Sequence, residues 1–125
     1  MRAAGTFEVK LSLLDSAEPI IGRMQLDKVF SGELDGVSRG EMLGIMDQGV
    51  GSGSYVALER ITGALNGRTG SFALVHRGTM NRGVPTLTVE VVPDSGTAGL
   101  SGLTGSMQII IEAGKHSYVL DYELP

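Results

Sequence analysis

The sequence predicts an all-β protein, an eight-stranded antiparallel up-and-down barrel that spans residues 1–125 as one domain. Apolar and polar residues alternate with a period of two through most of the chain, as they do in strands with one buried face. Asn66-Gly67 is a strong two-residue hairpin signal between two such segments. The chain also has 19 glycines in 125 residues, and each glycine weakens a helix by about 1 kcal/mol.

The composition excludes several classes of protein. No cysteine is present, so disulfide scaffolds, cysteine-based zinc sites and thiol enzymes are excluded. The formal net charge of −4 has the wrong sign for binding a phosphate backbone, so we expect no nucleic-acid partner. No apolar run approaches the roughly 20 residues of a membrane span, and the first residues lack the apolar core of a signal peptide. We therefore expect a cytoplasmic protein without a membrane partner.

Each expected strand follows from its alternation. Apolar residues share one face of 7–13, a connection containing Pro19 follows, and the second strand lies within 24–31. Further strands are expected near 37–46, 54–65, 70–79, 86–93, 104–112 and 115–124. A closed barrel is favoured over a sandwich because no strand carries an obvious inward lysine or mid-strand proline, which proteins use to protect exposed edges.

Two more dipeptides resemble the Asn66-Gly67 turn. Asp35-Gly36 and Ala113-Gly114 also indicate tight hairpins, the second less strongly. The segment 65–72 aligns with 100–107, and it aligns with 34–42 if one extra residue, Arg39, is allowed. An extra residue beside a glycine is typical of a β-bulge. We interpret the three segments as the same hairpin motif occurring three times in the chain.

The turn at Asn66-Gly67 fixes which residues face each other. Glu59 is then opposite Leu74, and Ala57 is opposite His76. Glu59 and His76 therefore lie on one face as diagonal neighbours, within reach of each other. The matching pairs beyond these are Ile61 with Phe72 and, about Ala113-Gly114, Ile111 with His116, Ile109 with Tyr118 and Met107 with Leu120.

The polar faces of the strands identify the interior. The other face of the last hairpin is polar, so the face with Tyr118 and Leu120 points inward, and the repeat places Phe72 on the same side. Glu41 is ambiguous. Strict alternation from Asp35-Gly36 places it inside opposite Phe30, whereas a bulge places it outside, with Met42 and Met46 inside.

A few polar residues are expected in an otherwise apolar interior. Glu59 and His76 are the candidate catalytic residues, as a general acid/base pair, and the alternative is a structural pair that satisfies two buried polar groups. The candidate ligand-binding residues are Tyr55, Phe72, Leu74, His116, Tyr118 and Tyr122. A metal site of Glu59, His76 and His116 is disfavoured because the histidines lie on distant strands. We expect neither metal nor cofactor.

The outer face of the second hairpin is unusually apolar. Val56, Leu58, Ala73 and Val75 form a patch that only arginines interrupt. A second subunit that covers this patch would explain it, so we expect a homo-oligomer. The alternative is a sandwich in which both faces are partly buried.

Several short motifs occur together along the chain. They are 40–43, 53–60, 67–72, 76–80, 91–97, His116-Ser117-Tyr118 and Asp121-Tyr122. In combination they resemble an uncharacterised family of small bacterial proteins with a barrel similar to that of allene oxide cyclase. The resemblance covers nearly the whole chain. It implies a calycin-like, allene-oxide-cyclase-like barrel and oligomerisation, but it implies no function, because unrelated functions share one fold.

The leading functional hypothesis is that the barrel binds a small, partly apolar molecule in its lumen. Apolar walls with a few convergent polar groups are typical of small-molecule sites. One alternative is an isomerase or cyclase in which Glu59 and His76 move a proton. Another is a packed barrel without a ligand that acts through oligomer assembly.

Overall fold

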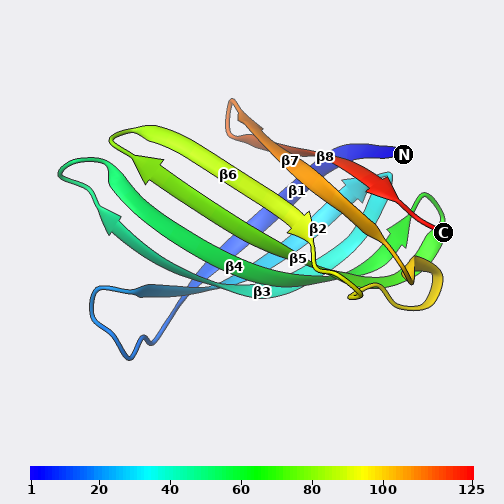
Figure 1. Cartoon of the computed structure of the whole chain (residues 1–125), viewed down its shortest axis with the longest axis horizontal. Coiled ribbons are helices and arrows are strands. Elements are labelled where there is room, and N and C mark those ends of the chain that lie inside the picture. Colours follow the sequence, from blue (N-terminus) through cyan, green and yellow to red (C-terminus); the bar gives the residue numbers. More distant parts are fainter.

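A computed structural model describes all residues, 1–125, and the predicted all-β, eight-stranded antiparallel barrel is confirmed. Each strand pairs with its neighbours in chain order, and β8 pairs with β1 to close the barrel (Figure 1). A 3-10 turn, η1, precedes β7. The strands are β1 (Arg2–Leu14), β2 (Gly22–Gly32), β3 (Leu34–Asp47), β4 (Ser52–Leu65), β5 (Arg68–Asn81), β6 (Val84–Val91), β7 (Thr104–Glu112) and β8 (Lys115–Glu123), and η1 is Ala98–Leu100.

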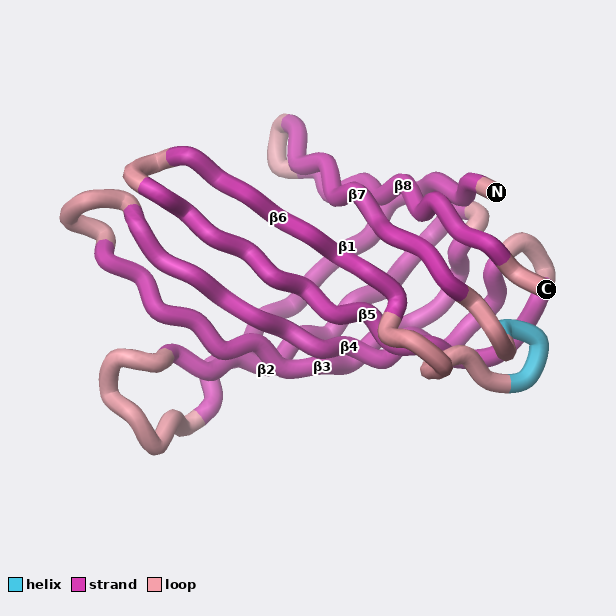
Figure 2. Tube along the Cα trace, viewed as in Figure 1, coloured by secondary structure: helices cyan, strands magenta, loops and turns pink.

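The two ends of the barrel differ. Strands β6 and β7 pair only at Glu90 and Ser106, and from there they diverge (Figures 1 and 2). We call the end with both chain termini and η1 the closed end. The opposite end, where β3 to β6 project beyond β7 and β8, is the open end (Figure 2). The barrel is therefore a complete ring only near the closed end.

The core fills the closed end. Phe30, Phe72 and Leu74 are at most 1% exposed. The Tyr118 hydroxyl accepts a hydrogen bond from the Leu34 N–H at 2.9 Å and lies 2.9 Å from the Leu34 carbonyl oxygen. Glycine at position 5 makes room for this hydroxyl, because a Cβ there would come 2.6 Å from it. No free lumen remains among these side chains.

Two of the three predicted turns are confirmed. Asn66 and Gly67 have φ values of 47° and 84°, and Ala113 and Gly114 have 50° and 76°, as a type I′ turn requires. A third turn of this kind, Arg82-Gly83, joins β5 to β6 with φ values of 48° and 84°. The sequence analysis missed this turn and left residues 80–85 between the strands expected near 70–79 and 86–93.

The predicted turn at Asp35-Gly36 is wrong. Both residues lie inside β3, and the chain turns at Gly32 and Glu33, where Gly32 has a φ of 112°. Gly36 therefore pairs with Phe30, and Glu41 pairs with Gln25 on the outer face. There the Glu41 carboxylate forms an ion pair of 2.7 Å with Arg23, which resolves the ambiguity about Glu41.

The three repeated segments do not share a hairpin. Only the segment at 65–72 contains one, whereas Ser101-Gly102 links η1 to β7. What the segments share is a leucine in the closed end. Leu34, Leu65 and Leu100 are 0%, 0% and 1% exposed. The repeated segments therefore share a leucine that packs into the core at the closed end of the barrel.

The absence of edge-protecting residues was also a wrong inference. Lys28 does point inward from β2 and is 6% exposed, although β2 pairs with β1 and β3 there and has no free edge. Pro85 lies in β6, opposite Met80 and next to the Asn81–Val84 pair that closes the turn. Backbone groups in an antiparallel pair point alternately to the two neighbours, so the nitrogen of Pro85 faces away from β5. The unpaired edge of β6 thus lacks one N–H donor, which is how prolines protect edges.

Candidate functional site

Glu59 and His76 form a buried pair inside the barrel. The predicted register is confirmed, with Glu59 opposite Leu74 and Ala57 opposite His76. Glu59 is 2% exposed and His76 is 4% exposed. His76 Nε2 lies 3.1 Å from Glu59 Oε1. Glu59 lies in the cross-strand row of Leu74, at the open-end side of the packed core, and His76 lies in the next row toward the open end, before that of Gly78.

Two residues that the sequence analysis missed, Lys28 and Ser38, also contact the Glu59 carboxylate. Lys28 Nζ lies 3.1 Å from Glu59 Oε2, and the Ser38 hydroxyl donates to the same oxygen at 3.1 Å. The ammonium of Lys28 also stands 4.9 Å from the ring centroid of Phe7, a favourable cation–π distance. The available signal was the alternation itself, since Lys28 shares the parity of the inward residues Leu26 and Phe30.

The charges in this cluster balance. Burial alone would raise the pKa of the Glu59 carboxyl, but the hydrogen bond from His76 and the positive charge of Lys28 outweigh it and hold the pKa below its ordinary value. Glu59 is therefore an ionised carboxylate at neutral pH, and a carboxylate only accepts hydrogen bonds. His76 must donate through its Nε2 proton. In the neutral imidazole this leaves Nδ1 as a free acceptor.

The inner face of the open end is apolar and hollow. A cross-strand row of Gly22, Gly44, Tyr55, Gly78 and Leu87 contributes few side chains, because three of the five residues are glycine. A pocket of about 610 Å³ lies over this row. Its side-chain walls come from Ile20, Met42, Met46, Met80, Pro85 and Leu87.

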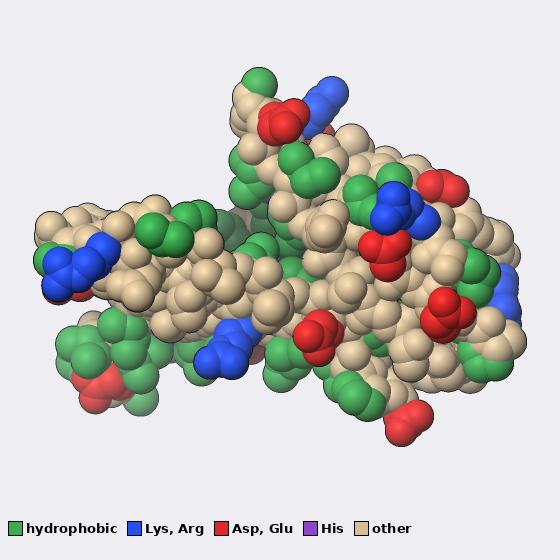
Figure 3. Space-filling model, turned by 45° about the horizontal axis from the view of Figure 1, so that its top comes forward, with side chains coloured by type: hydrophobic (Ala, Val, Ile, Leu, Met, Phe, Trp, Pro, Cys, Tyr) green, Lys and Arg blue, Asp and Glu red, His purple; other side chains and the backbone are tan.

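The hollow opens between the projecting hairpins. In the space-filling view, hydrophobic side chains lie in the recess between the end of the β3–β6 sheet and the β7–β8 hairpin (Figure 3). None of the residues that line the pocket is charged. The pocket is large enough for a small organic molecule, since ligand pockets typically measure about 300–1,000 Å³.

Tyr55 is the candidate residue that lines this pocket directly. It is half-buried, and its ring lies over Gly78, where a Cβ would overlap the ring. Burial raises the pKa of the Tyr55 hydroxyl, so it stays protonated at neutral pH. His76 lies one inner-face position deeper than Gly78, next to the pocket and diagonal to Tyr55.

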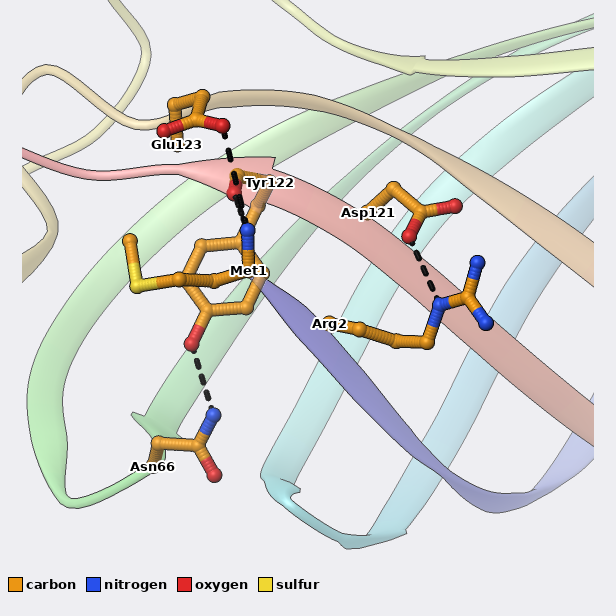
Figure 4. Close-up of polar contacts among 6 residues, drawn as sticks. All are labelled: Met1, Arg2, Asn66, Asp121, Tyr122 and Glu123. Carbon is orange, nitrogen blue, oxygen red and sulfur yellow. Dashed lines mark hydrogen bonds and ion pairs between the residues drawn. The ribbon is translucent and has the colours of Figure 1, made fainter.

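The other candidate residues lie elsewhere. Phe72, Leu74 and Tyr118 are fully buried in the packed core at the closed end. Tyr122 is near the chain ends, where its hydroxyl accepts a hydrogen bond of 2.7 Å from the Asn66 side chain (Figure 4). His116 packs against the ring of Phe7, with 5.2 Å between ring centroids. None of the five lines the pocket.

The contacts around Tyr122 support ring closure. The Met1 amino group donates to the Tyr122 carbonyl oxygen at 2.8 Å, and Arg2 pairs with Asp121 at 2.9 Å on the same two strands, β1 and β8 (Figure 4). Asn66, in the β4–β5 turn, reaches Tyr122 from the other side of the closed end. These contacts tie the first and last strands together.

Glu59 and His76 are the two metal-ligating side chains that meet inside the barrel. No group of three or more His, Asp or Glu side chains in the structure is arranged to hold a metal ion. The structure also contains no helix with the length and apolar character of a membrane span.

The predicted outer patch lies across β3 to β5. Val56, Leu58 and Val75 are 51%, 60% and 36% exposed, and Leu43 of β3 extends the patch with 44%. We call these four residues the outer patch. They surround a shallow hollow of about 330 Å³ that Arg23 and Glu41 border.

The comparisons with known proteins agree on one family. The family model described as "Protein of unknown function (DUF3224)" matches residues 3–122. The chain is also similar to a solved structure, a protein of unknown function from the DUF3224 family of Shewanella oneidensis MR-1. The two share 43% sequence identity with a TM-score of 0.93, and the alignment covers 100% of this chain and 98% of the other. No curated protein matches the sequence.

Proposed function

The chain belongs to the DUF3224 family of proteins of unknown function, and from its own site we propose that it binds a small, partly apolar molecule in the pocket at the open end. This site is not the lumen of a complete ring, because side chains fill the closed end. The ligand lies instead on the inner face of the projecting sheet.

The uncharged, apolar pocket of about 610 Å³ carries this proposal. Half-exposed methionines on the inner face have water on one side, so a ligand that covers them removes apolar surface from water. Each 100 Å² of such surface contributes about 2.5 kcal/mol. Methionine is also flexible and polarizable, which lets a wall of Met42, Met46 and Met80 adapt to the shape of a ligand.

A neutral apolar probe tests the proposal. N-phenyl-1-naphthylamine fluoresces strongly when it leaves water, and we expect saturable binding with one site per chain. Met80→Glu places a charge in the pocket wall and should abolish the signal, because an unpaired charge is costly in an apolar site. Ile111→Glu is the control, since Ile111 is 64% exposed and lies outside the pocket. Equal binding by both variants would contradict the proposal.

A second candidate function is proton transfer on the bound molecule, as in an isomerase or cyclase. The observation that favours it is the contact between His76 and Glu59, which orients the ring and leaves Nδ1 as the basic nitrogen. Neither side chain is bonded to the backbone; each is held by other side chains. A carboxylate that fixes the imidazole in this way also stabilises the imidazolium that forms during proton transfer.

We further propose that the chain self-associates through the outer patch. Its four apolar residues are contiguous on the outer face of β3 to β5 and are 36–60% exposed. Apolar patches on a protein surface are often interaction sites. A cytoplasmic location and a calycin-like, allene-oxide-cyclase-like form of the barrel remain predictions of the sequence analysis.

A further inference from the structure

Two polar atoms beside the pocket have no hydrogen-bond partner within the chain. They are the Tyr55 hydroxyl oxygen and His76 Nδ1, since Tyr55 makes no side-chain hydrogen bond and His76 bonds only through Nε2. No side-chain nitrogen or oxygen that is shielded from solvent lacks a partner. Both atoms are therefore accessible, although the His76 side chain is only 5% exposed.

The direction of Nδ1 follows from the other ring nitrogen. In an imidazole the two nitrogens point to nearly opposite sides of the ring. Nε2 points toward Glu59, which lies in the next row toward the closed end. Nδ1 thus faces away from Glu59, and the next inner-face position of β5 on the open-end side of His76 is Gly78, over which the Tyr55 ring lies.

One of these two atoms is a hydrogen-bond acceptor and the other is a donor. Nδ1 accepts, because Nε2 carries the proton that is donated to the Glu59 carboxylate. The Tyr55 hydroxyl keeps its proton, so it can donate. Tyr55 and His76 are diagonal neighbours on one face, a separation of about 7–8 Å at Cα that aromatic side chains can span. One ligand group that both accepts and donates would satisfy both.

The charge of the site disfavours an ionised ligand. Lys28 is the cation inside the barrel near the pair, and both oxygens of Glu59 already hold its ammonium at 3.1–3.2 Å. None of the residues that line the pocket is charged. A carboxylate ligand would accept from Tyr55, but it could not donate to Nδ1, and it would lose its hydration without gaining a counter-ion.

The floor and walls of the pocket suit a flat ring. On the floor, Gly22 and Gly44 contribute backbone without side chains, and the flat ring of Tyr55 covers Gly78. Met42, Met46 and Met80 stand around this floor. Contacts between methionine sulfur and an aromatic ring are favourable by about 0.3–1.5 kcal/mol. A flat aromatic framework therefore fits better than a branched aliphatic one.

From these observations we infer that the ligand is an uncharged aromatic alcohol whose hydroxyl accepts from Tyr55 and donates to His76 Nδ1. This inference rests on the proposed binding function and adds the chemical class of the ligand. It makes Tyr55 and His76 the residues that determine specificity, while the methionines and glycines provide apolar contact.

Three probes that share the naphthalene ring and differ only at one substituent test the inference about the ligand. Naphthalene, 2-naphthol and 2-naphthoate are titrated into the full chain at pH 8 and followed by their own fluorescence. Each net hydrogen bond contributes about 0.5–1.5 kcal/mol, so the two bonds together should make 2-naphthol bind about five- to 150-fold more tightly than naphthalene. 2-Naphthoate should bind least tightly, because it is ionised and cannot donate.

Variants of the chain show which residues are responsible for the preference for 2-naphthol over naphthalene. Tyr55→Phe and His76→Phe should each bring the ratio of the 2-naphthol and naphthalene affinities closer to one, with the affinity for naphthalene kept. Ser117→Ala, which removes a hydroxyl from the outer face of β8, should leave the ratio unchanged. Circular dichroism checks that each variant is folded. Should His76→Phe not fold, the Tyr55→Phe ratio and the order of the three probes still decide the outcome.

Each outcome has a separate meaning. Equal binding of naphthalene and 2-naphthol, or tightest binding of 2-naphthoate, would overturn the aromatic-alcohol inference and leave the binding proposal intact. A ratio that does not change in Tyr55→Phe would also overturn it. Binding of none of the three probes would overturn the proposed function together with the inference.

Discussion

The ring of Tyr55 occupies the space in which a side chain at position 78 would stand. Gly78 is directly opposite Tyr55 in the pairing of β4 and β5, and a Cβ added there would overlap the ring. The glycine thus fixes where the ring lies, and with it the position of the hydroxyl at the pocket. His76 is the inner-face neighbour of Gly78 along β5 on the side of the closed end, so Gly78 lies between the pocket and the buried pair.

Gly78→Ala should therefore weaken ligand binding more than it weakens the fold. The added methyl group would displace the Tyr55 ring into the pocket, and we expect the affinity for N-phenyl-1-naphthylamine to fall severalfold. Gly67→Ala is the matched control. Gly67 has a φ of 84° and open space around it, so alanine there costs about 1–2 kcal/mol of backbone strain without touching the pocket. Equal affinities of Gly78→Ala and the wild type would contradict the role of this contact.

Removal of the Glu59 charge should destabilise the barrel through Lys28. Glu59→Gln leaves the buried ammonium without its counter-ion, and breaking a buried pair in this way costs about 3–5 kcal/mol of unfolding free energy. The double variant Lys28→Met/Glu59→Gln removes both charges and should regain most of that loss. Urea denaturation gives the unfolding free energies of the wild type, of the two single variants Glu59→Gln and Lys28→Met, and of the double variant. If the double variant loses the sum of the two single losses, the two charges are not coupled.

The same cluster predicts loss of stability in acid. The folded pKa of Glu59 lies below its ordinary value of 4.5, so its contribution to stability is complete above that pH and is lost as pH falls through the folded pKa. The unfolding free energy of the wild type should decline below about pH 4.5 more steeply than that of Lys28→Met/Glu59→Gln. Hydrogen bonds from Gln25 and Arg39 lower the pKa of Asp27 too, but Asp27 is present in both proteins. If the unfolding free energies of the two proteins fall in parallel with pH, Glu59 is not the source of the loss of stability in acid.

Tyr118→Phe should cost stability and leave the pocket intact. Its hydroxyl bonds the backbone N–H and carbonyl oxygen of Leu34 inside the closed end, both at 2.9 Å. Loss of the hydroxyl leaves these buried groups unsatisfied, at a cost of about 1–3 kcal/mol. Thermal denaturation and probe binding measured on the same sample separate the two effects. A loss of probe affinity at full stability would place Tyr118 in the binding site instead.

Leu58→Lys should dissociate the oligomer that we propose. Leu58 is 60% exposed at the centre of the outer patch, and a charge there cannot be buried against a second copy without a partner. Val37→Lys is the control, because Val37 is 57% exposed on the same outer sheet but outside the patch. Sedimentation velocity reports the mass of each protein. A wild type that sediments as a monomer at all concentrations would contradict self-association through this surface.

Much of the fold could be predicted because strand pairing is a local rule. Once Asn66-Gly67 was placed at a turn, the period of two fixed Glu59 opposite Leu74 and Ala57 opposite His76, and both pairings are present. The same rule failed at Asp35-Gly36. There the chain turns earlier, at Gly32, whose φ of 112° favours a glycine without a recognisable two-residue signal.

By itself the sequence determined the number of strands, the faces of Glu59 and His76, and the apolar outer patch, because each follows from alternation between neighbouring residues. Only the tertiary structure decided that one end is packed while the other is hollow. That difference depends on which side chains meet in cross-strand rows, such as glycines 22, 44 and 78 around Tyr55. It depends as well on β6 and β7 pairing at one position, Glu90 with Ser106. Such rows join residues far apart in the chain, and the volume they leave depends on how the strands diverge, which no single segment encodes.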